Sequence, residues 1–215
     1  MSGPVPVQPE GLEPVAYPGV LIGFRPIAPG DEFALLPDEE RSIATNVVAA
    51  RRASGAARVV ARELLGRLGF AGSSIPKSAS GAPVWPSGVT GSLAHDETVA
   101  VAAAGLSRDL DAVGIDIEPA QPLPSEVLPL VATPEDLAGC GDHAYAGRLV
   151  FAAKEAVYKA LWSCDGPRLD YLDIRIDLSR GRAATRTGAT VDLRYSVGGH
   201  ILVLAAARAV AGRRG

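Results

Sequence analysis

Two acidic residues lie two positions apart in a short run of β-branched residues. Residues 113–118 read Val-Gly-Ile-Asp-Ile-Glu. Side chains alternate along a β-strand, so Asp116 and Glu118 would share one face and Ile115 and Ile117 the other. Neighbouring carboxylates repel each other, and a shared hard cation such as Mg²⁺ relieves that repulsion. The pattern indicates a magnesium site, and the alternative is a strand whose polar face meets water.

A second group of charges belongs to a helix expected from about residue 144 to 162. At about 100° per residue, one apolar side comprises Leu149, Ala153, Ala156, Val157 and Ala160. The opposite stripe comprises Phe151, Glu155, Tyr158 and Trp162. A helix that is apolar on two sides is covered on both, so Lys154, Glu155 and Lys159 need a partner, an ion or a ligand. The alternative is a surface ion pair between Glu155 and Lys159, which are four residues apart.

Basic residues precede the acidic strand. Arg51, Arg58 and Arg62 fall on one face of an expected helix, and Lys77 and His95 lie in or after a Gly/Pro-rich loop. Guanidinium and ammonium groups donate charge-assisted hydrogen bonds, so this set suits a ligand with several phosphates. The alternatives are a solvated helix face and a structural histidine.

These residues need two similar sets of elements to position them. A helix should begin at Asp38, weaken or break at Gly55 and end before Gly69. Residues 71–91 read as an ordered loop. Strands are expected at about 20–24, 99–104, 112–117, 174–178, 190–195 and 201–206. We therefore expect an α/β (α+β) fold with two halves, residues 1–111 and 112–215, each a long helix on a small, mostly antiparallel sheet.

Composition limits the setting and the partners. The chain has 215 residues and a formal net charge of −3, which gives no basic footprint for nucleic acid. Its longest apolar runs are far too short to span a membrane. Two cysteines make no disulfide framework, and with three scattered histidines they make no structural zinc site. We expect a soluble, cytoplasmic monomer.

Together these motifs resemble the Sfp/EntD-type 4′-phosphopantetheinyl transferases. Three blocks carry the resemblance: Pro83-Val84-Trp85-Pro86 leading to Gly91-Ser92-Leu93-Ala94-His95, then residues 113–119, then residues 151–160. Their order and spacing match the family, and the resemblance spans roughly residues 35–206. It implies a pseudo-twofold pair of halves with coenzyme A bound between them.

The resemblance also implies a reaction. The family transfers the 4′-phosphopantetheine group of coenzyme A to a serine of an acyl or peptidyl carrier protein, as in polyketide and nonribosomal peptide biosynthesis, and releases 3′,5′-ADP. Mg²⁺ would be held by Asp116, Glu118 and Glu155. Phosphoryl transfer depends on positioning and charge neutralisation more than on a covalent nucleophile, which suits these residue types.

By position in the motifs, the remaining roles follow from the resemblance. Arg58, Lys77 and His95 would contact the phosphates of the coenzyme, and Lys154 and Lys159 would neutralise its diphosphate. Glu155 would also accept the serine proton, directly or through water.

The chain departs from the family pattern in two places. Ala50 replaces the first arginine of the helix signature, so Arg51 takes that phosphate contact or the contact is missing. Asp96 follows His95 where relatives often carry Cys or Ser, and we expect Asp96 to orient His95 and favour its imidazolium.

Two other functions are compatible with parts of the pattern. A Mg²⁺-dependent nuclease also uses clustered carboxylates, but it needs a lysine two residues after an acid, and Pro119 and Ala120 follow Glu118. A non-catalytic module would bind coenzyme A without turnover.

Overall fold

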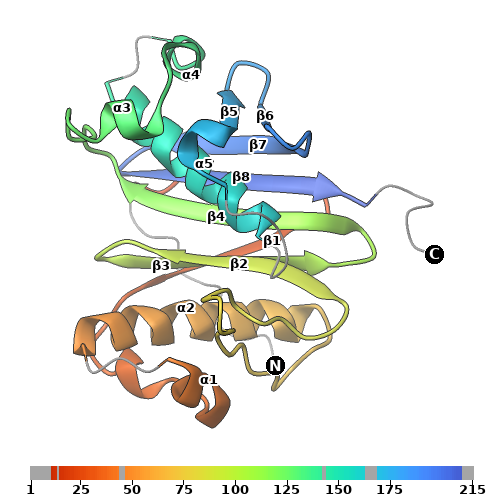
Figure 1. Ribbon diagram of the computed structural model, residues 1–215. Helices are drawn as coiled ribbons and strands as arrows, with labels where there is room; N and C mark the ends of the chain where they lie inside the picture. Colours follow the sequence, from red (N-terminus) through yellow and green to blue (C-terminus); the bar gives the residue numbers. More distant parts are fainter. Residues whose placement is uncertain (1–10, 14, 44–46, 142–143, 163–168, 210–215) are drawn as a thin grey trace.

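The computed structural model describes residues 11–13, 15–43, 47–141, 144–162 and 169–209. In Figure 1 its elements form four layers, with two sheets face to face in the middle and helices on both outer sides. All strand pairs are antiparallel. The longest helix of each half packs on its own sheet, which confirms the predicted fold class.

The first sheet has the order β1-β3-β2 and the second the order β4-β8-β7-β6-β5. The first contains β1 (Leu21–Pro26), β2 (Val89–His95) and β3 (Val99–Leu106). The second contains β4 (Leu110–Pro119), β5 (Ile174–Asp177), β6 (Arg182–Thr185), β7 (Thr190–Val197) and β8 (His200–Arg208). Strands β2 and β6 were not among the expected strands.

The helices divide between the two outer layers. The first layer has α1 (Pro37–Ser42), α2 (Val48–Arg67) and the short 3₁₀ turn η1 (Asp31–Phe33). The second has α3 (Leu128–Val131), α4 (Pro134–Ala138), α5 (Ala146–Leu161) and the 3₁₀ turn η2 (Tyr171–Asp173). Among the described residues, no helix has the length and apolar character that crossing a bilayer requires.

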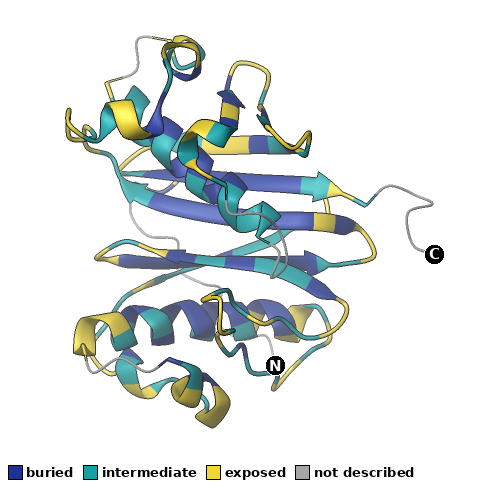
Figure 2. Cartoon of the chain, viewed as in Figure 1, coloured by how far each residue is buried: buried dark blue, intermediate teal, exposed yellow. Residues whose placement is uncertain are grey.

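The two sheets share a core, and their central strands are buried on both faces, as the dark blue strands in Figure 2 show. Val101 and Ala103 of β3 meet Ile115 and Ile117 of β4 between the sheets. The alternate residues of β3, Ala102 and Ala104, face α2 instead. Because both faces are covered, these strands appear in the sequence as unbroken apolar runs.

The predicted weak point at Gly55 was wrong. Gly55 lies inside α2, where a Cβ would come within 1.8 Å of the Asp31 carbonyl oxygen. Glycine therefore allows η1 to pack directly against the helix. The expected single helix is instead divided earlier, with α1 ending at Ser42 and α2 beginning at Val48.

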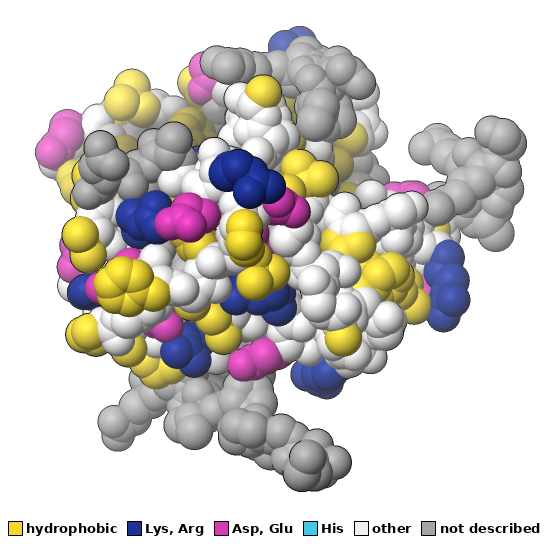
Figure 3. All heavy atoms as spheres, turned by 90° about the horizontal axis from the view of Figure 1, so that it is seen from below, with side chains coloured by type: hydrophobic (Ala, Val, Ile, Leu, Met, Phe, Trp, Pro, Cys, Tyr) yellow, Lys and Arg dark blue, Asp and Glu magenta, His cyan; other side chains and the backbone are white. Residues whose placement is uncertain are grey.

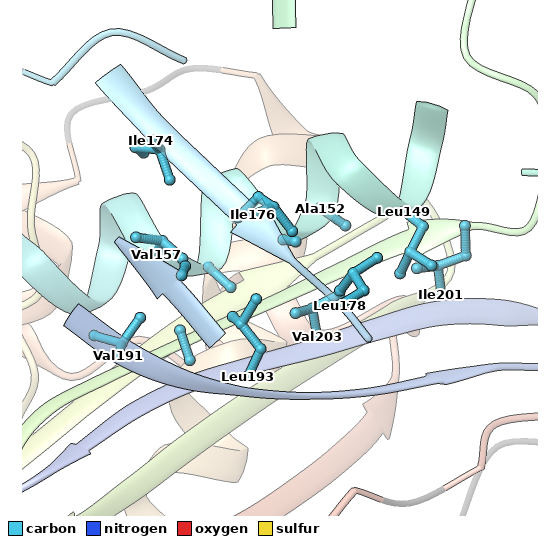
Figure 4. Close-up of a cluster of buried hydrophobic side chains, with 14 residues drawn as sticks. Leu149, Ala152, Val157, Ile174, Ile176, Leu178, Val191, Leu193, Ile201 and Val203 are labelled. Atoms are coloured by element: carbon cyan, nitrogen blue, oxygen red, sulfur yellow. The ribbon is translucent and has the colours of Figure 1, made fainter. Parts of the chain in front are cut away.

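Helix α5 covers the outer face of the second sheet. Figure 4 shows Leu149, Ala152 and Val157 of α5 directed toward side chains from β5, β7 and β8. The contact with β4 is closer still, because a Cβ at Gly114 would lie 1.9 Å from the Ala156 carbonyl oxygen. The α5 backbone thus rests on β4 at this glycine.

One ion pair lies within this core. Lys154 and Asp136 are both fully buried, and Lys154 Nζ donates to Asp136 Oδ2 over 2.6 Å. Asp136 also accepts hydrogen bonds from the backbone amides of Ile176 and Thr133. Burial opposes ionisation of Asp136, but these hydrogen bonds outweigh it and lower the pKa of the carboxyl group. The pair therefore ties α4, α5 and β5 together.

We expect Gly114→Ala to destabilise the protein, because the new methyl group meets helix backbone that cannot rotate away. Overpacking of this kind costs about 1–3 kcal/mol of unfolding free energy, measured by urea denaturation. Gly66→Ala is the control, since nothing lies within 4 Å of its Cβ position and alanine favours the helix. Equal stability of Gly114→Ala and the wild type would contradict the close packing.

We expect Lys154→Met to reduce the unfolding free energy by about 3–5 kcal/mol, because it leaves the Asp136 carboxylate buried without a cation. The double variant Asp136→Leu/Lys154→Met should recover much of that loss, since it removes both charges. Urea denaturation of the two variants tests this directly. A single variant as stable as the double one would show that the pair is not coupled.

Candidate functional site

The acidic residues of β4 lie on the side of the sheet that α5 covers. Ile115 and Ile117 are buried between the sheets, and Asp116 and Glu118 point the other way, as predicted. Gly114 lies on the same face and lets α5 approach closely. Side chains from both ends of α5 can therefore reach the two carboxylates.

Asp116 is bound by the lysine near the end of α5. Lys159 Nζ donates to Asp116 Oδ1 over 2.6 Å, and only 5% of the Asp116 surface is exposed. Burial raises the pKa of Asp116 to about 7, outweighing the attraction of Lys159, and repulsion from Glu118 and Glu155 adds to the rise. Its second oxygen, Oδ2, is buried and has no hydrogen-bond partner in the described part of the chain.

Glu118 is bound by an arginine near the start of α5. Arg148 donates to Glu118 Oε2 over 2.9 Å. Burial raises the pKa of Glu118, and Arg148 offsets part of that rise. Arg148 was not among the predicted site residues, although its spacing of seven residues from Glu155 places both on one side of a helix.

Glu155 does not pair with Lys159, so the predicted alternative of a surface ion pair is wrong. Its Oε1 instead accepts a short hydrogen bond from the hydroxyl group of Tyr171 in η2. Burial and this hydrogen bond raise the pKa of the Tyr171 phenol, which keeps it protonated and able to donate. Nothing in the local sequence pattern pointed to Tyr171.

The donor set suits a hard cation. Asp116, Glu118 and Glu155 supply only oxygen ligands, which Mg²⁺ prefers, and the unpartnered Oδ2 of Asp116 is an available ligand atom. Glu118 and Glu155 lie near enough to raise the pKa of Asp116 by repulsion. Within the described ranges, however, no three acidic, histidine or cysteine side chains already converge as a metal cluster. Ion binding would therefore require these side chains to move closer together.

A cleft of about 450 Å³ lies between the two halves next to these carboxylates. Three predicted site residues line it: Lys77 from the first half, and Glu155 and Lys159 from the second. Trp85 lines the first-half side, and a hydrogen bond of 3.3 Å from Trp162 Nε1 to Ser80 Oγ joins the two sides. The cleft thus holds charged groups from both halves, as the expected ligand position requires.

The predicted role of Lys154 in neutralising the diphosphate was wrong. Lys154 has no exposed surface, and its ammonium group is bound by Asp136 and the Tyr171 carbonyl oxygen. It precedes Glu155 directly, but one residue turns a helix by about 100° and directs the side chain into the core. Sequence periodicity gave no sign of the buried partner.

The arginines of α2 interact mainly with the protein itself. Arg58 is 5% exposed, and its Nε donates to the Ile75 carbonyl oxygen over 2.8 Å. Burial lowers the pKa of its guanidinium group. Arg51 pairs with Glu40 over 2.6 Å. On the face seen from below in Figure 3, Lys and Arg side chains are likewise interspersed with Asp and Glu side chains.

His95 is exposed at the end of β2, but Asp96 does not orient it as predicted. The Asp96 carboxylate accepts hydrogen bonds from Thr98 and Val99 and pairs with Nε2 of His200 over 3.0 Å. His95 Nδ1 lies 3.2 Å from the Asp96 backbone oxygen instead. The Asp96 side chain therefore links the first half to β8 of the second.

Comparisons with known proteins agree with this arrangement. A family profile described as 4′-phosphopantetheinyl transferase N-terminal domain matches residues 38–105. A second, described as 4′-phosphopantetheinyl transferase superfamily, matches residues 112–207. The two profiles together cover most of the chain.

Three relatives carry the same description. The chain is 36% identical over 168 residues to 4′-phosphopantetheinyl transferase Svp of Streptomyces mobaraensis, covering 74% of this chain and 68% of that protein. It is 37% identical over 157 residues to 4′-phosphopantetheinyl transferase Npt of Nocardia iowensis, covering 71% of each. It is 35% identical over 145 residues to 4′-phosphopantetheinyl transferase PptT of Mycobacterium tuberculosis, covering 66% of this chain and 64% of that protein. These matches confirm the resemblance drawn from the motifs: the chain belongs to the 4′-phosphopantetheinyl transferase superfamily.

Proposed function

We propose that this enzyme transfers the 4′-phosphopantetheine group of coenzyme A to a serine of an acyl or peptidyl carrier protein, with Mg²⁺ held by Asp116, Glu118 and Glu155. The observation that carries the proposal is the cleft, where Lys77 of one half faces Glu155 and Lys159 of the other. A diphosphate with a further phosphate group needs cations on more than one side, and the two halves supply them.

We propose that the two halves divide the work at residues 111 and 112. Residues 1–111 would hold the phosphates of coenzyme A, with Lys77 in the cleft and His95 exposed at the end of β2. Residues 112–215 would hold the three carboxylates and the α5 side chains that contact them. Arg58 was predicted to contact a phosphate group, but it is buried and bonded to backbone carbonyl oxygens. We propose instead that it acts indirectly, because its hydrogen bond to Ile75 fixes the segment that leads to Lys77.

The ion pairs of Asp116 and Glu118 suit an exchange of partners on ligand binding. Lys159 and Arg148 now neutralise Asp116 and Glu118. Bound Mg²⁺ would supply charge neutralisation at the diphosphate. Lys159 and Arg148 could then donate to phosphate oxygens in place of the carboxylates.

In the chemical step, one phosphorus–oxygen bond forms and another breaks. The serine oxygen of the carrier protein bonds to the phosphorus that bears pantetheine, and the bond from that phosphorus to the leaving phosphate oxygen breaks. The leaving group is 3′,5′-ADP. The serine proton passes to the Glu155 carboxylate, directly or through a water molecule.

The family assignment favours this reaction over the two alternatives from the sequence. The interleaved charges in Figure 3 and the net charge of −3 do not suit the nucleic-acid substrate of a nuclease. A non-catalytic module would bind coenzyme A but leave an apo-carrier protein unchanged.

Mass spectrometry of apo-carrier protein after incubation with coenzyme A, with Mg²⁺ or with a chelator, tests the proposal. A mass increase of one phosphopantetheine group that needs Mg²⁺ is the expected result.

We further propose a cytoplasmic setting and a monomer. Cys140 is a free thiol, which is compatible with a reducing compartment. Gel filtration with light scattering would report the oligomeric state.

We expect Glu155→Gln to lower the transfer rate by about 10²–10⁴-fold, the range for loss of a general base. Asp116→Ala should also lose Mg²⁺-dependent transfer. Lys159→Ala should lower the rate without raising the Mg²⁺ concentration needed for half-maximal activity, because it removes the cation that competes for Asp116. The measurement is turnover against Mg²⁺ concentration for the three variants. Near-normal rates and Mg²⁺ requirements in Glu155→Gln and Asp116→Ala would contradict the proposed site.

We expect Lys77→Ala to weaken coenzyme A binding by about 1.5–3 kcal/mol, the usual contribution of a charged hydrogen bond. Calorimetric titration with coenzyme A measures the change, and repeating it with a coenzyme that lacks the 3′-phosphate shows whether Lys77 contacts that group. Arg108→Ala is the control, because this exposed arginine lies outside the cleft. Equal affinities of the two variants would place Lys77 outside the binding site.

A further inference from the structure

Among the described residues, Tyr171 is the one that hydrogen-bonds to the carboxylate of Glu155. The phenol hydroxyl donates to Glu155 Oε1. The Glu155 side chain has no second hydrogen-bond partner in the described part of the chain, so its Oε2 is available to a ligand. A single donor on one oxygen restricts how the carboxylate can rotate without occupying both of its oxygens.

The backbone of Tyr171 is itself fixed from the other side. Its carbonyl oxygen accepts a hydrogen bond of 3.0 Å from Lys154 Nζ, and Lys154 is held by the buried Asp136. Asp136 also accepts a hydrogen bond of 2.8 Å from the amide of Ile176, in the strand that follows η2. The buried ion pair therefore fixes the chain immediately before and within β5.

Three further contacts hold the η2 turn. The Tyr171 ring packs against Phe151 of α5 with a centroid distance of 5.7 Å. The backbone amide of Asp170 donates to Asp173 over 3.0 Å, and Asp173 pairs with Arg186 over 2.6 Å. Tyr171 is thus held at its backbone, its ring and its turn.

This arrangement connects two neighbouring residues of α5 that point in different directions. Lys154 is directed into the core and Glu155 lines the cleft. Tyr171 joins them, with its carbonyl oxygen on Lys154 and its hydroxyl group on Glu155. A displacement of η2 would therefore be transmitted to the Glu155 carboxylate.

We infer that Tyr171, anchored through its backbone to the Asp136–Lys154 pair, is a positioning residue that sets the orientation of Glu155 in the cleft. The inference rests on the proposed role of Glu155. It also gives the buried ion pair a function beyond stability, because a carboxylate that ligates a cation or accepts a proton must be held in a defined orientation.

Tyr171→Phe tests this inference, because it removes the hydroxyl group and keeps the ring on Phe151. The matched control is Tyr17→Phe, which removes a phenol hydroxyl that donates to Asp192 over 2.8 Å, with no Tyr17 side chain in the cleft. Five quantities are measured for each variant: the melting temperature, kcat, KM for coenzyme A, the Mg²⁺ concentration for half-maximal rate, and Mn²⁺ binding to the enzyme–coenzyme A complex by electron paramagnetic resonance.

We expect Tyr171→Phe to weaken Mn²⁺ binding or lower kcat by about 10–100-fold, the usual effect of removing a group that orients a metal ligand. Its KM for coenzyme A should stay near the wild-type value. The melting temperatures of Tyr171→Phe and Tyr17→Phe should be similar, and Tyr17→Phe should keep wild-type kcat and Mn²⁺ binding.

Two different results would overturn the inference, and Glu155→Gln measured alongside separates them. If Glu155→Gln is impaired while Tyr171→Phe matches Tyr17→Phe, Glu155 has its proposed role and Tyr171 does not position it. If Glu155→Gln itself keeps wild-type turnover and Mn²⁺ binding, the proposed role of Glu155 fails and the inference fails with it.

Discussion

The site depends on the direct contact between the α5 backbone and β4. At Gly114 there is no room for a Cβ, because the Ala156 carbonyl oxygen and the Ala160 amide nitrogen lie within 1.9 and 2.5 Å of its position. This approach brings α5 over the strand face that carries Asp116 and Glu118. Any residue larger than glycine would move the helix outward and separate Lys159 and Arg148 from those carboxylates.

The same close packing removes water from the charges in this layer, so each must find a partner in the protein. Asp116 takes Lys159, Glu118 takes Arg148, and Asp136 takes Lys154. Glu118 and Glu155 are near enough to raise the pKa of Asp116. Because each carboxylate is held by a different partner, the three do not form a ready-made metal cluster in the described residues. The Asp116–Lys159 and Glu118–Arg148 pairs are partly exposed beside the proposed ligand site, whereas the Asp136–Lys154 pair is enclosed in the core.

The sequence was sufficient for the fold class and for the division of β4 into an apolar and an acidic face. Both predictions depend on local periodicity, which neighbouring residues determine. A ligand position between the two halves, by contrast, was implied by the resemblance to the family. The errors involve contacts between distant segments. Lys154 looks like a cleft lysine until Asp136 is brought against it, and Gly55 looks like a helix break until η1 packs on it. Asp96 binds His200, more than a hundred residues away, rather than its neighbour.

The use of basic residues differs between the halves in a way that bears on ligand binding. In the first half, Arg51, Arg52 and Arg62 are paired with Glu40, Glu32 and Glu39. With Ala50 in place of the family's arginine, the α2 face offers few unpaired cations for phosphates. Lys77 has no ion pair among the described residues. Lys159 is paired with Asp116, whose pKa burial raises to about 7. On the proposed function, Lys77 and Lys159, which reach the cleft from opposite halves, would matter more for phosphate binding than the arginines of α2.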